Sequence, residues 1–435
     1  MPLALPKSRA EIRRIQSERK RVAVEQAMRS SFWKKRFSNI NLEKLDDPEV
    51  WRKIPILDKD TLRGLTDRQF YSEFCIEAPE GIQEYWRSGG VTGAPLFYPR
   101  SFRDMEYGLL SFARTYDCAG AARGDRAHVS FPMGIHPVGQ VFSRCAESRG
   151  ITVNWAGSGA STPSALQLEL IQRLKPTIWL GMSSYALHLA NLAEARGIDL
   201  TALSIKRILT SAEPVSQAKR DKIERSWGAR LTDTFGMTEA GMMGAESKDD
   251  AAGLGFRLWS DMFFVEVLDP ATFAPAREGE VGTLVVTSLW TNNVTPFLRW
   301  SSGDLVTYAE ADDEGDENAG PFSVFPRLKH AHRTTGFFKV RGINLGHQDL
   351  EDFMFRQAEI GDFRAEAVNE GGLDMLRLSI ELRRGVDVEV FSSFLSEKIK
   401  ETFELAPRIV ALETGTLAKE FEANVKAARF VDRRN

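Results

Sequence analysis

A turn rich in glycine and hydroxyl residues, Ser88-Gly89-Gly90-Val91-Thr92-Gly93, follows a predicted strand over residues 82–86. Glycine lets backbone N–H groups approach a ligand closely, and serine and threonine hydroxyls add further donors, which suits a polyphosphate. No lysine follows the last glycine, so the segment is not a Walker A loop. Taken alone, the same residues also fit an ordinary turn.

A second segment that could do chemistry is Asp233-Thr234-Phe235-Gly236-Met237-Thr238-Glu239, which also follows a predicted strand. A phenylalanine ring can stack on a purine, and glycine allows close approach of a ligand. The adjacent threonine and glutamate suit phosphate and Mg²⁺. The competing interpretation is that Glu239 caps a following helix.

The third segment covers residues 295–304 and ends in Ser301-Ser302-Gly303-Asp304. A carboxylate after a glycine turn can accept hydrogen bonds from both hydroxyls of a ribose. An aspartate that only stabilises a tight turn explains the same residues.

Two histidines, His330 and His332, invite a metal-binding interpretation, but no cysteine lies near them and the chain has only 6 histidines. The sequence therefore disfavours a metal site of the zinc type. Neither HExxH nor GxSxG occurs, which disfavours a metalloprotease or a serine hydrolase.

Alternating strand and helix patterns from about residue 100 to 245 must position these segments. Helices are predicted over residues 165–175, 184–196 and 214–227, ended by Pro176, Gly197 and Gly228, with strands over 177–180, 205–209 and 230–234 between them. This repetition predicts an α/β fold with a mostly parallel sheet covered by helices. Residues 8–36 are basic and helical in pattern, and we expect a solvated surface helix there.

After residue 255 the pattern changes to runs rich in β-branched and aromatic residues. Residues 262–268 and 282–289 predict antiparallel strands, and the acidic residues 309–320 predict an exposed loop. The last hundred residues predict a small α+β unit with helices near 348–356 and 390–403. We expect a large N-terminal domain over residues 1–334, with parallel-rich sheets and a β subdomain, and a small C-terminal domain over residues 335–435.

Composition indicates an ordinary globular enzyme. The net charge of −3 gives no electrostatic reason to expect nucleic acid as a partner. No apolar run is long enough to span a membrane and the N-terminus does not resemble a signal peptide, so no membrane association is expected. The 3 widely spaced cysteines argue against a disulfide framework and suit the reducing cytoplasm.

Taken in order, these segments and several shorter ones resemble the phenylacetate–CoA ligase family, part of the adenylate-forming superfamily of acyl-CoA synthetases, luciferases and adenylation domains. The resemblance covers nearly the whole chain. Its further motifs are Phe131-Pro132-Met133-Gly134, Ser183 to Leu187, Ser211-Ala212-Glu213-Pro214, Trp259-Ser260-Asp261, Arg341-Gly342-Ile343-Asn344 and Val425 to Arg429.

The resemblance implies a role for each matching residue. ATP phosphates would be held by Ser88, Gly89, Gly90, Thr92 and Gly93, and the adenosine by Ser211, Ala212, Glu213, Pro214, Asp233, Phe235, Gly236, Met237, Asp304 and Arg333. Thr238 and Glu239 would bind phosphate and Mg²⁺, with Glu239 as the metal ligand. Lys426 would neutralise charge between the substrate carboxylate and the α-phosphate while acyl-adenylate forms.

The family is also expected to rotate its small C-terminal domain after this first half-reaction. Arg341 and Gly342 would then line the channel for coenzyme A, whose thiol attacks the acyl-adenylate and releases AMP. Several positions depart from the family pattern, including Ala94 where the phosphate loop commonly has lysine and Thr335 or Gly336 where a hinge aspartate is usual. The cysteine-rich zinc loop of some relatives is missing, so no structural zinc is expected.

The acyl pocket implied by the resemblance has apolar walls that suit an aromatic or arylacetic acid. Its residues would be Phe131, Met133, Gly134, His136, Tyr185 and Met242. His136 could recognise a ring substituent, or simply be a packed position. Two alternatives to a CoA ligase stay open: an adenylating enzyme that acylates a carrier protein or an amine, and a non-catalytic nucleotide-binding relative. A homodimer is expected only from the family.

Overall fold

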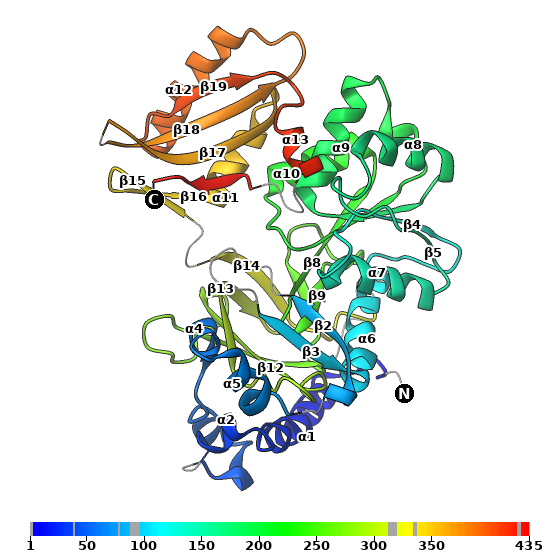
Figure 1. The fold of residues 1–435 in the computed structure, drawn as a ribbon, viewed down its shortest axis with the longest axis vertical. Helices are drawn as coiled ribbons and strands as arrows, with labels where there is room; N and C mark the ends of the chain where they lie inside the picture. The colour runs from blue at the N-terminus through cyan, green and yellow to red at the C-terminus, as the bar shows by residue number, and fades with distance from the viewer. Residues whose placement is uncertain are drawn as a thin grey trace. The chain divides into compact units, whose positions relative to one another are not determined.

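The computed structural model describes residues 3–37, 40–76, 79–87, 96–311, 320–333, 337–371, 373–423 and 428–434. The chain forms two compact units, each built from separated stretches of sequence. Unit 1 comprises Met1–Asp125, Met133–Val153 and Thr232–Thr334; unit 2 comprises Arg126–Pro132, Asn154–Leu231 and Thr335–Asn435. Figure 1 labels the elements of both units.

Unit 1 combines an antiparallel sheet with helices from the first 150 residues. Its helices are α1 (Arg9–Ala27), α2 (Ser31–Lys34), α3 (Pro48–Trp51), α4 (Lys59–Arg63), α5 (Asp67–Gln69), α6 (Phe102–Cys118) and α7 (Pro137–Ser148). Its strands are β1 (Leu57–Asp58), β2 (Ile82–Arg87), β3 (Phe97–Ser101), β9 (Gly241–Ala245), β10 (Phe256–Leu258), β11 (Phe263–Leu268), β12 (Gly282–Ser288), β13 (Trp300–Ala309) and β14 (Arg327–Arg333). Two strands, β5 (Thr152–Asn154) and β8 (Arg230–Met237), contain residues of both units.

The sheet of unit 1 runs in the order β11-β12-β13-β14-β10-β9-β8, and β1 pairs with β13. Pairing of β11 with β12 is antiparallel, which confirms the prediction for these two runs. Strands β2 and β3 form a separate antiparallel hairpin that places Trp86 opposite Tyr98 and Glu84 opposite Arg100. The connection of this hairpin contains the predicted phosphate segment, which lies outside the described residues.

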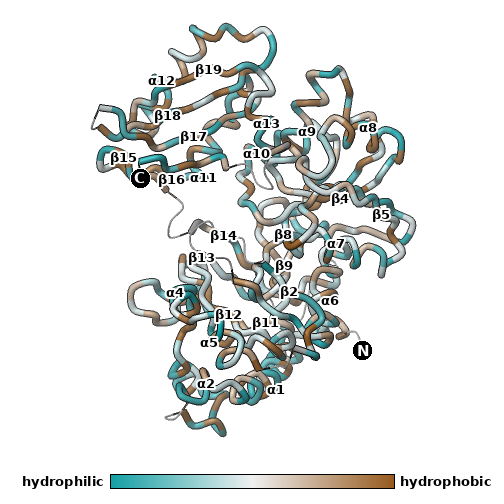
Figure 2. Tube along the Cα trace, in the orientation of Figure 1, coloured by the Kyte–Doolittle hydropathy of each residue, from teal (hydrophilic) through white to brown (hydrophobic). Residues whose placement is uncertain are grey.

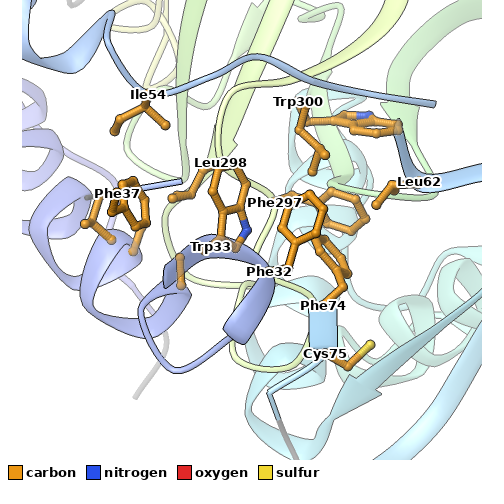
Figure 3. Packing of buried hydrophobic residues seen from close by; sticks show 14 of the residues in the cluster. Phe32, Trp33, Phe37, Ile54, Leu62, Phe74, Cys75, Phe297, Leu298 and Trp300 are labelled. Carbon is orange, nitrogen blue, oxygen red and sulfur yellow. The ribbon is translucent and has the colours of Figure 1, made fainter. Parts of the chain in front are cut away.

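An aromatic cluster forms much of the core of unit 1. Figure 3 shows Trp33, Phe32, Phe74 and Phe297 directed toward one another from distant parts of the chain. The ring centroids of Phe74 and Phe297 are 5.6 Å apart, and the Trp33 indole donates to the Pro296 carbonyl at 2.9 Å. Edge-to-face contacts of this kind stabilise a core beyond the area they bury. The cluster therefore holds residues 296–300, from which β13 leads to Asp304.

Helix α1 has the exposed charged face expected of a surface helix, but its other face is buried. It ends at Ala27, and Ile12 and Val24 are almost fully buried. The ammonium of Lys20 lies 5.0 Å from the ring centroid of Trp51 and 4.7 Å from that of Phe264. Basic side chains can bury their methylene stems against apolar surface. The many basic residues therefore made the buried face of this amphipathic helix difficult to detect in the sequence.

Unit 2 contains three parallel strands, β4 (Arg126–Val129), β6 (Ile178–Gly181) and β7 (Arg207–Thr210), in the order β7-β6-β4. Helices α8 (Ser164–Leu174) and α9 (Ser183–Ala195) lie between these strands in the sequence, and α10 (Gln217–Trp227) follows β7. Ile178, Trp179 and Leu180 have no exposed surface, as expected for a parallel strand with both faces covered. The predicted strand–helix repetition is confirmed to within a few residues at each end.

The C-terminal part of unit 2 has a four-stranded sheet in the order β19-β18-β17-β20, whose first three strands lie side by side in Figure 1. Its elements are β15 (Phe337–Val340), β16 (Ile343–Gly346), α11 (His347–Arg356), β17 (Ile360–Glu370), β18 (Leu373–Leu382), α12 (Val388–Phe403), β19 (Arg408–Leu412), α13 (Ala418–Ala423) and β20 (Phe430–Asp432). Arg341 and Gly342 connect β15 to β16 with φ of 50° and 83°. Two positive φ angles are typical of a type I′ hairpin turn.

Hydrophilic and hydrophobic residues alternate along the elements of both units (Figure 2). Among the described residues, no helix combines the length and the apolar character needed to cross a bilayer. All three cysteines are buried and free. The assignment of residues 1–334 and 335–435 to two domains stays a prediction.

Candidate functional site

The predicted site residues fall on both units, and each set is described within its own unit. Unit 1 carries Met133, Gly134, His136, Asp233, Phe235, Gly236, Met237, Thr238, Glu239, Met242, Asp304 and Arg333. Unit 2 carries Phe131, Tyr185, Ser211, Ala212, Glu213, Pro214, Arg341 and Gly342. Ser88, Gly89, Gly90, Thr92, Gly93 and Lys426 lie outside the described residues, as do Thr335 and Gly336.

Thr238 and Glu239 occupy the turn between the antiparallel strands β8 and β9. No helix follows them, so the interpretation of Glu239 as a helix cap is wrong. A side chain on Gly236 would place its Cβ 2.6 Å from the Gly241 carbonyl oxygen, and Gly241 itself has a φ of 95°. Both glycines are therefore required for this tight approach of the two strands.

The carboxylate of Glu239 and the backbone of its turn are held by residues of β3. The Arg100 guanidinium donates through Nη2 to the carbonyl oxygens of Thr238 and Glu239, each at 2.6 Å. The Tyr98 hydroxyl donates to Glu239 Oε1 at 3.1 Å. Glu239 is 4% exposed, so its carboxylate is held in a mostly buried position.

Asp304 on β13 lies in a polar and aromatic group that includes Phe235. His330 Nε2 is 3.2 Å from Asp304 Oδ1, and the Ser302 hydroxyl donates to Oδ2. The Phe235 ring stacks on Phe256 with centroids 5.5 Å apart and lies 6.0 Å from the His330 ring. The structure thus brings together the aromatic residue and the carboxylate that the sequence predicts for adenine and ribose, and adds His330 between them.

The backbone of Arg333 lies opposite Asp304 in the β13–β14 ladder, while its side chain is outside the description. Within the described ranges, no group of three or more histidine, cysteine, aspartate or glutamate side chains could hold a metal ion. His330 contacts Asp304, which gives it a partner that needs no metal.

His136, one of the residues predicted to bind the acid, is the N-cap residue of helix α7 in unit 1. Burial lowers the pKa of His136, and the nearby Arg87 lowers it further, so the imidazole is neutral at pH 7. Gly134 has a φ of 94°, and its carbonyl accepts a hydrogen bond of 2.7 Å from Gln140. Met242 is buried in β9, and Met237 packs against the aromatic cluster.

Glu213 of unit 2 caps a helix. Its carboxylate accepts from the backbone N–H of Ser184 at 2.9 Å, from the Ser184 hydroxyl at 2.7 Å and from the Ser183 hydroxyl at 3.0 Å. These residues begin α9, where a negative charge is stabilised by the helix dipole. Ala212, the residue before, has a φ of 70°, which costs a residue with a Cβ about 1–2 kcal/mol and is often found at functional sites.

A buried lysine links this helix cap to the C-terminal part of unit 2. Lys219 on α10 is 2% exposed, and its ammonium lies 3.7 Å from Glu213 Oε2 and 3.2 Å from Glu351 Oε1 on α11. Arg429 contacts Glu351 at 3.4 Å from the other side. Because each charge has opposite charges beside it, the burial of this network is compensated.

Tyr185 is 2% exposed, and its hydroxyl lies 3.0 Å from the Ser164 hydroxyl on α8. His188 contacts the same Ser164 Oγ at 3.0 Å. Phe131 has no exposed surface. The predicted roles of Tyr185 and Phe131 in binding the acid stay predictions.

Lys222, on the same helix as Lys219, provides a test of the packing of α10. It is 4% exposed and donates to the carbonyl oxygens of Ile360 and Gly361, and burial lowers its pKa from 10.5 to about 8. Between these two values the unfolded chain binds more protons than the folded chain, so this lysine makes stability rise with pH there. Below pH 8 Lys222 is charged in both the folded and the unfolded chain, so the full free-energy cost of burying its charge lowers stability.

We therefore expect the free energy of unfolding of the unchanged chain to gain about 3 kcal/mol relative to Lys222→Met between pH 8 and pH 10.5. Urea unfolding of both proteins at several pH values measures this difference, because titrations elsewhere cancel. A difference independent of pH would contradict the assigned environment of Lys222.

Tyr98, Arg100 and Lys219 were missed by the sequence interpretation, and His330 was considered only as a metal ligand. A weak signal existed for the first two: a tyrosine and an arginine two residues apart lie a few residues after the glycine-rich segment, a spacing that places them on one face of a strand. Their partners are 141 and 138 residues away, so nothing local identified them.

Known proteins resemble this chain in both sequence and fold. Residues 88–293 match the sequence model of the family described as AMP-binding enzyme. The phenylacetate–coenzyme A ligase of Thermus thermophilus is 28% identical over 401 residues, covering 90% of this chain and 86% of the relative. That of Aromatoleum evansii is 27% identical over 438 residues, covering 98% and 96%.

Among solved structures, 2-hydroxyisobutyryl-CoA ligase in its postadenylation state superimposes with a TM-score of 0.83. It is 22% identical and covers 98% of this chain and 89% of its own, so this likeness concerns the fold. The matched model is that of AMP-binding enzymes, and the fold is that of an adenylate-forming CoA ligase. Over most of its length the chain is similar to phenylacetate–CoA ligases, which confirms the predicted resemblance, the α/β fold and the class of AMP-forming acid–CoA ligases.

Proposed function

We propose that the chain activates an aromatic carboxylic acid with ATP and transfers the acyl group to coenzyme A. The observation that carries this proposal is the group formed in unit 1 by Phe235, His330 and Asp304 beside the Glu239 turn. A flat aromatic surface, a ribose-accepting carboxylate and a metal-binding carboxylate are what an adenosine triphosphate requires. The curated relatives that act on phenylacetate support an aromatic acid.

In the first half-reaction, a carboxylate oxygen of the acid attacks the α-phosphorus of ATP. The bond between this phosphorus and the β-phosphate oxygen breaks, and pyrophosphate leaves. Attack of one anion on another requires positioning and cationic screening. We assign the screening to Lys426 and the positioning of the nucleotide to Phe235 and Asp304.

Mg²⁺ is the cation expected with ATP. It is commonly held by one or two carboxylates together with substrate phosphates, and the single carboxylate of Glu239, in the turn that also contains Thr238, fits such a site. When bound, Mg²⁺ would neutralise phosphate charge. The chain's own contribution is to hold the Glu239 carboxylate in a buried and fixed position.

In the second half-reaction, the thiolate of coenzyme A attacks the acyl carbonyl and AMP leaves. Arg341 and Gly342, at the tip of the β15–β16 hairpin, are the residues we assign to the coenzyme A channel. The Arg341 guanidinium donates to the Asp374 carbonyl at 2.9 Å, which fixes its position relative to β18.

ATP–pyrophosphate exchange tests the first half-reaction. We expect phenylacetate, benzoate or indole-3-acetate to support exchange, and acetate to support much less because it leaves an apolar pocket empty. Exchange with acetate alone would contradict the aromatic assignment. If no acid supports exchange and the chain does not bind ATP, the proposal that it is an ATP-dependent enzyme is contradicted.

Addition of coenzyme A then tests the acceptor. Formation of a thioester and stoichiometric AMP is expected. If acyl-adenylate forms but coenzyme A does not accept the acyl group, a carrier protein or an amine is the acceptor instead.

A further inference from the structure

We propose that Tyr98 and Arg100 are positioning residues that hold the Glu239 carboxylate for binding of the metal–ATP complex. This inference rests on the proposed function, because it concerns the ATP site. It adds two residues that the sequence interpretation did not identify, and it explains how a strand next to the predicted phosphate segment controls a distant carboxylate.

Arg100 holds the backbone of the turn. Its Nη2 donates to two successive carbonyl oxygens, those of Thr238 and Glu239, at 2.6 Å each. Its Nη1 lies 3.3 Å from the Thr291 carbonyl oxygen and 3.4 Å from Thr295 Oγ1. A planar guanidinium held on both sides in this way fixes the position of the turn, which the single point charge of a lysine cannot reproduce.

The surroundings of Arg100 make its orientation rigid. The side chain is 2% exposed, and the guanidinium carbon lies 4.8 Å from the ring centroid of Trp86 on the paired strand β2. Trp86 is itself fixed, since its indole donates to Glu84 Oε1 at 2.6 Å. Burial between an aromatic ring and backbone carbonyls leaves the arginine little freedom to move.

Tyr98 holds the side chain of the same glutamate. Its hydroxyl donates to Glu239 Oε1 at 3.1 Å, and the tyrosine is 1% exposed. Because an ionised carboxylate has no proton to donate, the Tyr98 hydroxyl is the donor in this hydrogen bond.

The positions of the two residues on β3 explain why they act together. Residues two apart on a strand point to the same face, so Tyr98 and Arg100 both reach the Thr238–Glu239 turn. Residues 88–95 connect β2 to β3, and therefore the strand that leaves the predicted phosphate segment also holds the predicted metal ligand.

The test is the dependence of ATP binding on Mg²⁺, measured by isothermal titration calorimetry on the full chain without acid or coenzyme A. Each protein is titrated with ATP in MgCl₂ and in EDTA. The readout is the Kd in EDTA divided by the Kd in MgCl₂. For Tyr98→Phe we expect this ratio to fall about five- to tenfold, with the Kd in EDTA unchanged, since a hydrogen bond to a charged group is lost. Glu239→Gln gives the reference value of this ratio for a chain that lacks the proposed metal ligand.

Tyr71→Phe is the matched control. The Tyr71 hydroxyl donates to the Phe97 carbonyl of the same strand β3 at 3.1 Å but does not contact Glu239, so its removal should leave the ratio unchanged. Arg100→Lys should lower the ratio at least as much as Tyr98→Phe. Thermal unfolding establishes whether each variant is folded. If Arg100→Lys does not fold, the proposal is tested with Tyr98→Phe alone.

An unchanged ratio in Tyr98→Phe would overturn the proposal. Equal weakening of ATP binding in MgCl₂ and in EDTA would also overturn it, because this result indicates a structural role only. If the unchanged chain binds ATP without any effect of Mg²⁺, the proposed function itself fails along with the inference.

Discussion

Replacement of Lys426 by alanine is expected to lower acyl-adenylate formation by about a thousandfold. Transfer of the acyl group from preformed acyl-adenylate to coenzyme A should stay within about threefold of the unchanged rate. The physical reason is that the first half-reaction joins the substrate carboxylate to the α-phosphorus, so a cation between these two anions stabilises its transition state. By the domain rotation that the family implies, Lys426 would leave before the thiol of coenzyme A attacks the acyl carbonyl carbon.

The two half-reactions can be measured separately. Pyrophosphate exchange reports the first, and thioester formation from synthetic acyl-adenylate reports the second. Lys419→Ala is the control, since Lys419 is an exposed lysine of α13 a few residues earlier. An equal loss in both half-reactions would show that Lys426 has been placed wrongly, and a loss in Lys419→Ala as large as that in Lys426→Ala would point to α13 as a whole.

Replacement of Asp261 by asparagine is expected to destabilise unit 1 by about 3–5 kcal/mol. Asp261 accepts two hydrogen bonds of 2.8 Å from the Arg114 guanidinium on α6, and both residues are almost fully buried. Loss of the negative charge leaves a buried arginine uncompensated where few water molecules can solvate it. The Trp259-Ser260-Asp261 motif thus anchors α6 to the segment that precedes β11.

Urea unfolding of the unchanged chain, Asp261→Asn and the double variant with Arg114→Met measures this effect. The double variant should lose less unfolding free energy than Asp261→Asn alone, because it contains no unpaired buried charge. Asp46→Asn provides a control, as Asp46 pairs with Arg21 at the surface and should change stability by less than about 1 kcal/mol. Similar losses of unfolding free energy for Asp46→Asn and Asp261→Asn would contradict the inference that burial makes the loss of Asp261 costly.

Much of the local structure could be predicted because its causes are local. The predicted helix over residues 184–196 corresponds to α9, and the predicted end at Gly228 is a C-cap in the left-handed region. The predicted helix over residues 214–227 begins only at Gln217, where the Ser216 side chain caps it. Helix α1 differs most, because a helix with many basic residues shows its buried face poorly in the sequence.

For the candidate site, the sequence identified the segments but not the contacts of their side chains. Glu239 could be placed at the end of a strand, yet its partners Tyr98 and Arg100 come from another part of the chain. Glu213 could be assigned to a nucleotide-binding segment, yet its carboxylate caps α9. Neither contact follows from spacing, since each depends on which strands and helices become neighbours.

The sequence by itself indicated the class of enzyme, because the segments at residues 88–93, 233–239 and 303–304 and near 426 resemble, in the same order, those of the phenylacetate–CoA ligase family. Periodicity and capping likewise determined most helices and strands, since these depend on residues within a few positions of one another. Tertiary structure alone decided that Arg100 holds the Glu239 turn and that His330 contacts Asp304. The physical reason is that ladder register and core packing, which join residues far apart in the chain, decide which buried polar groups meet.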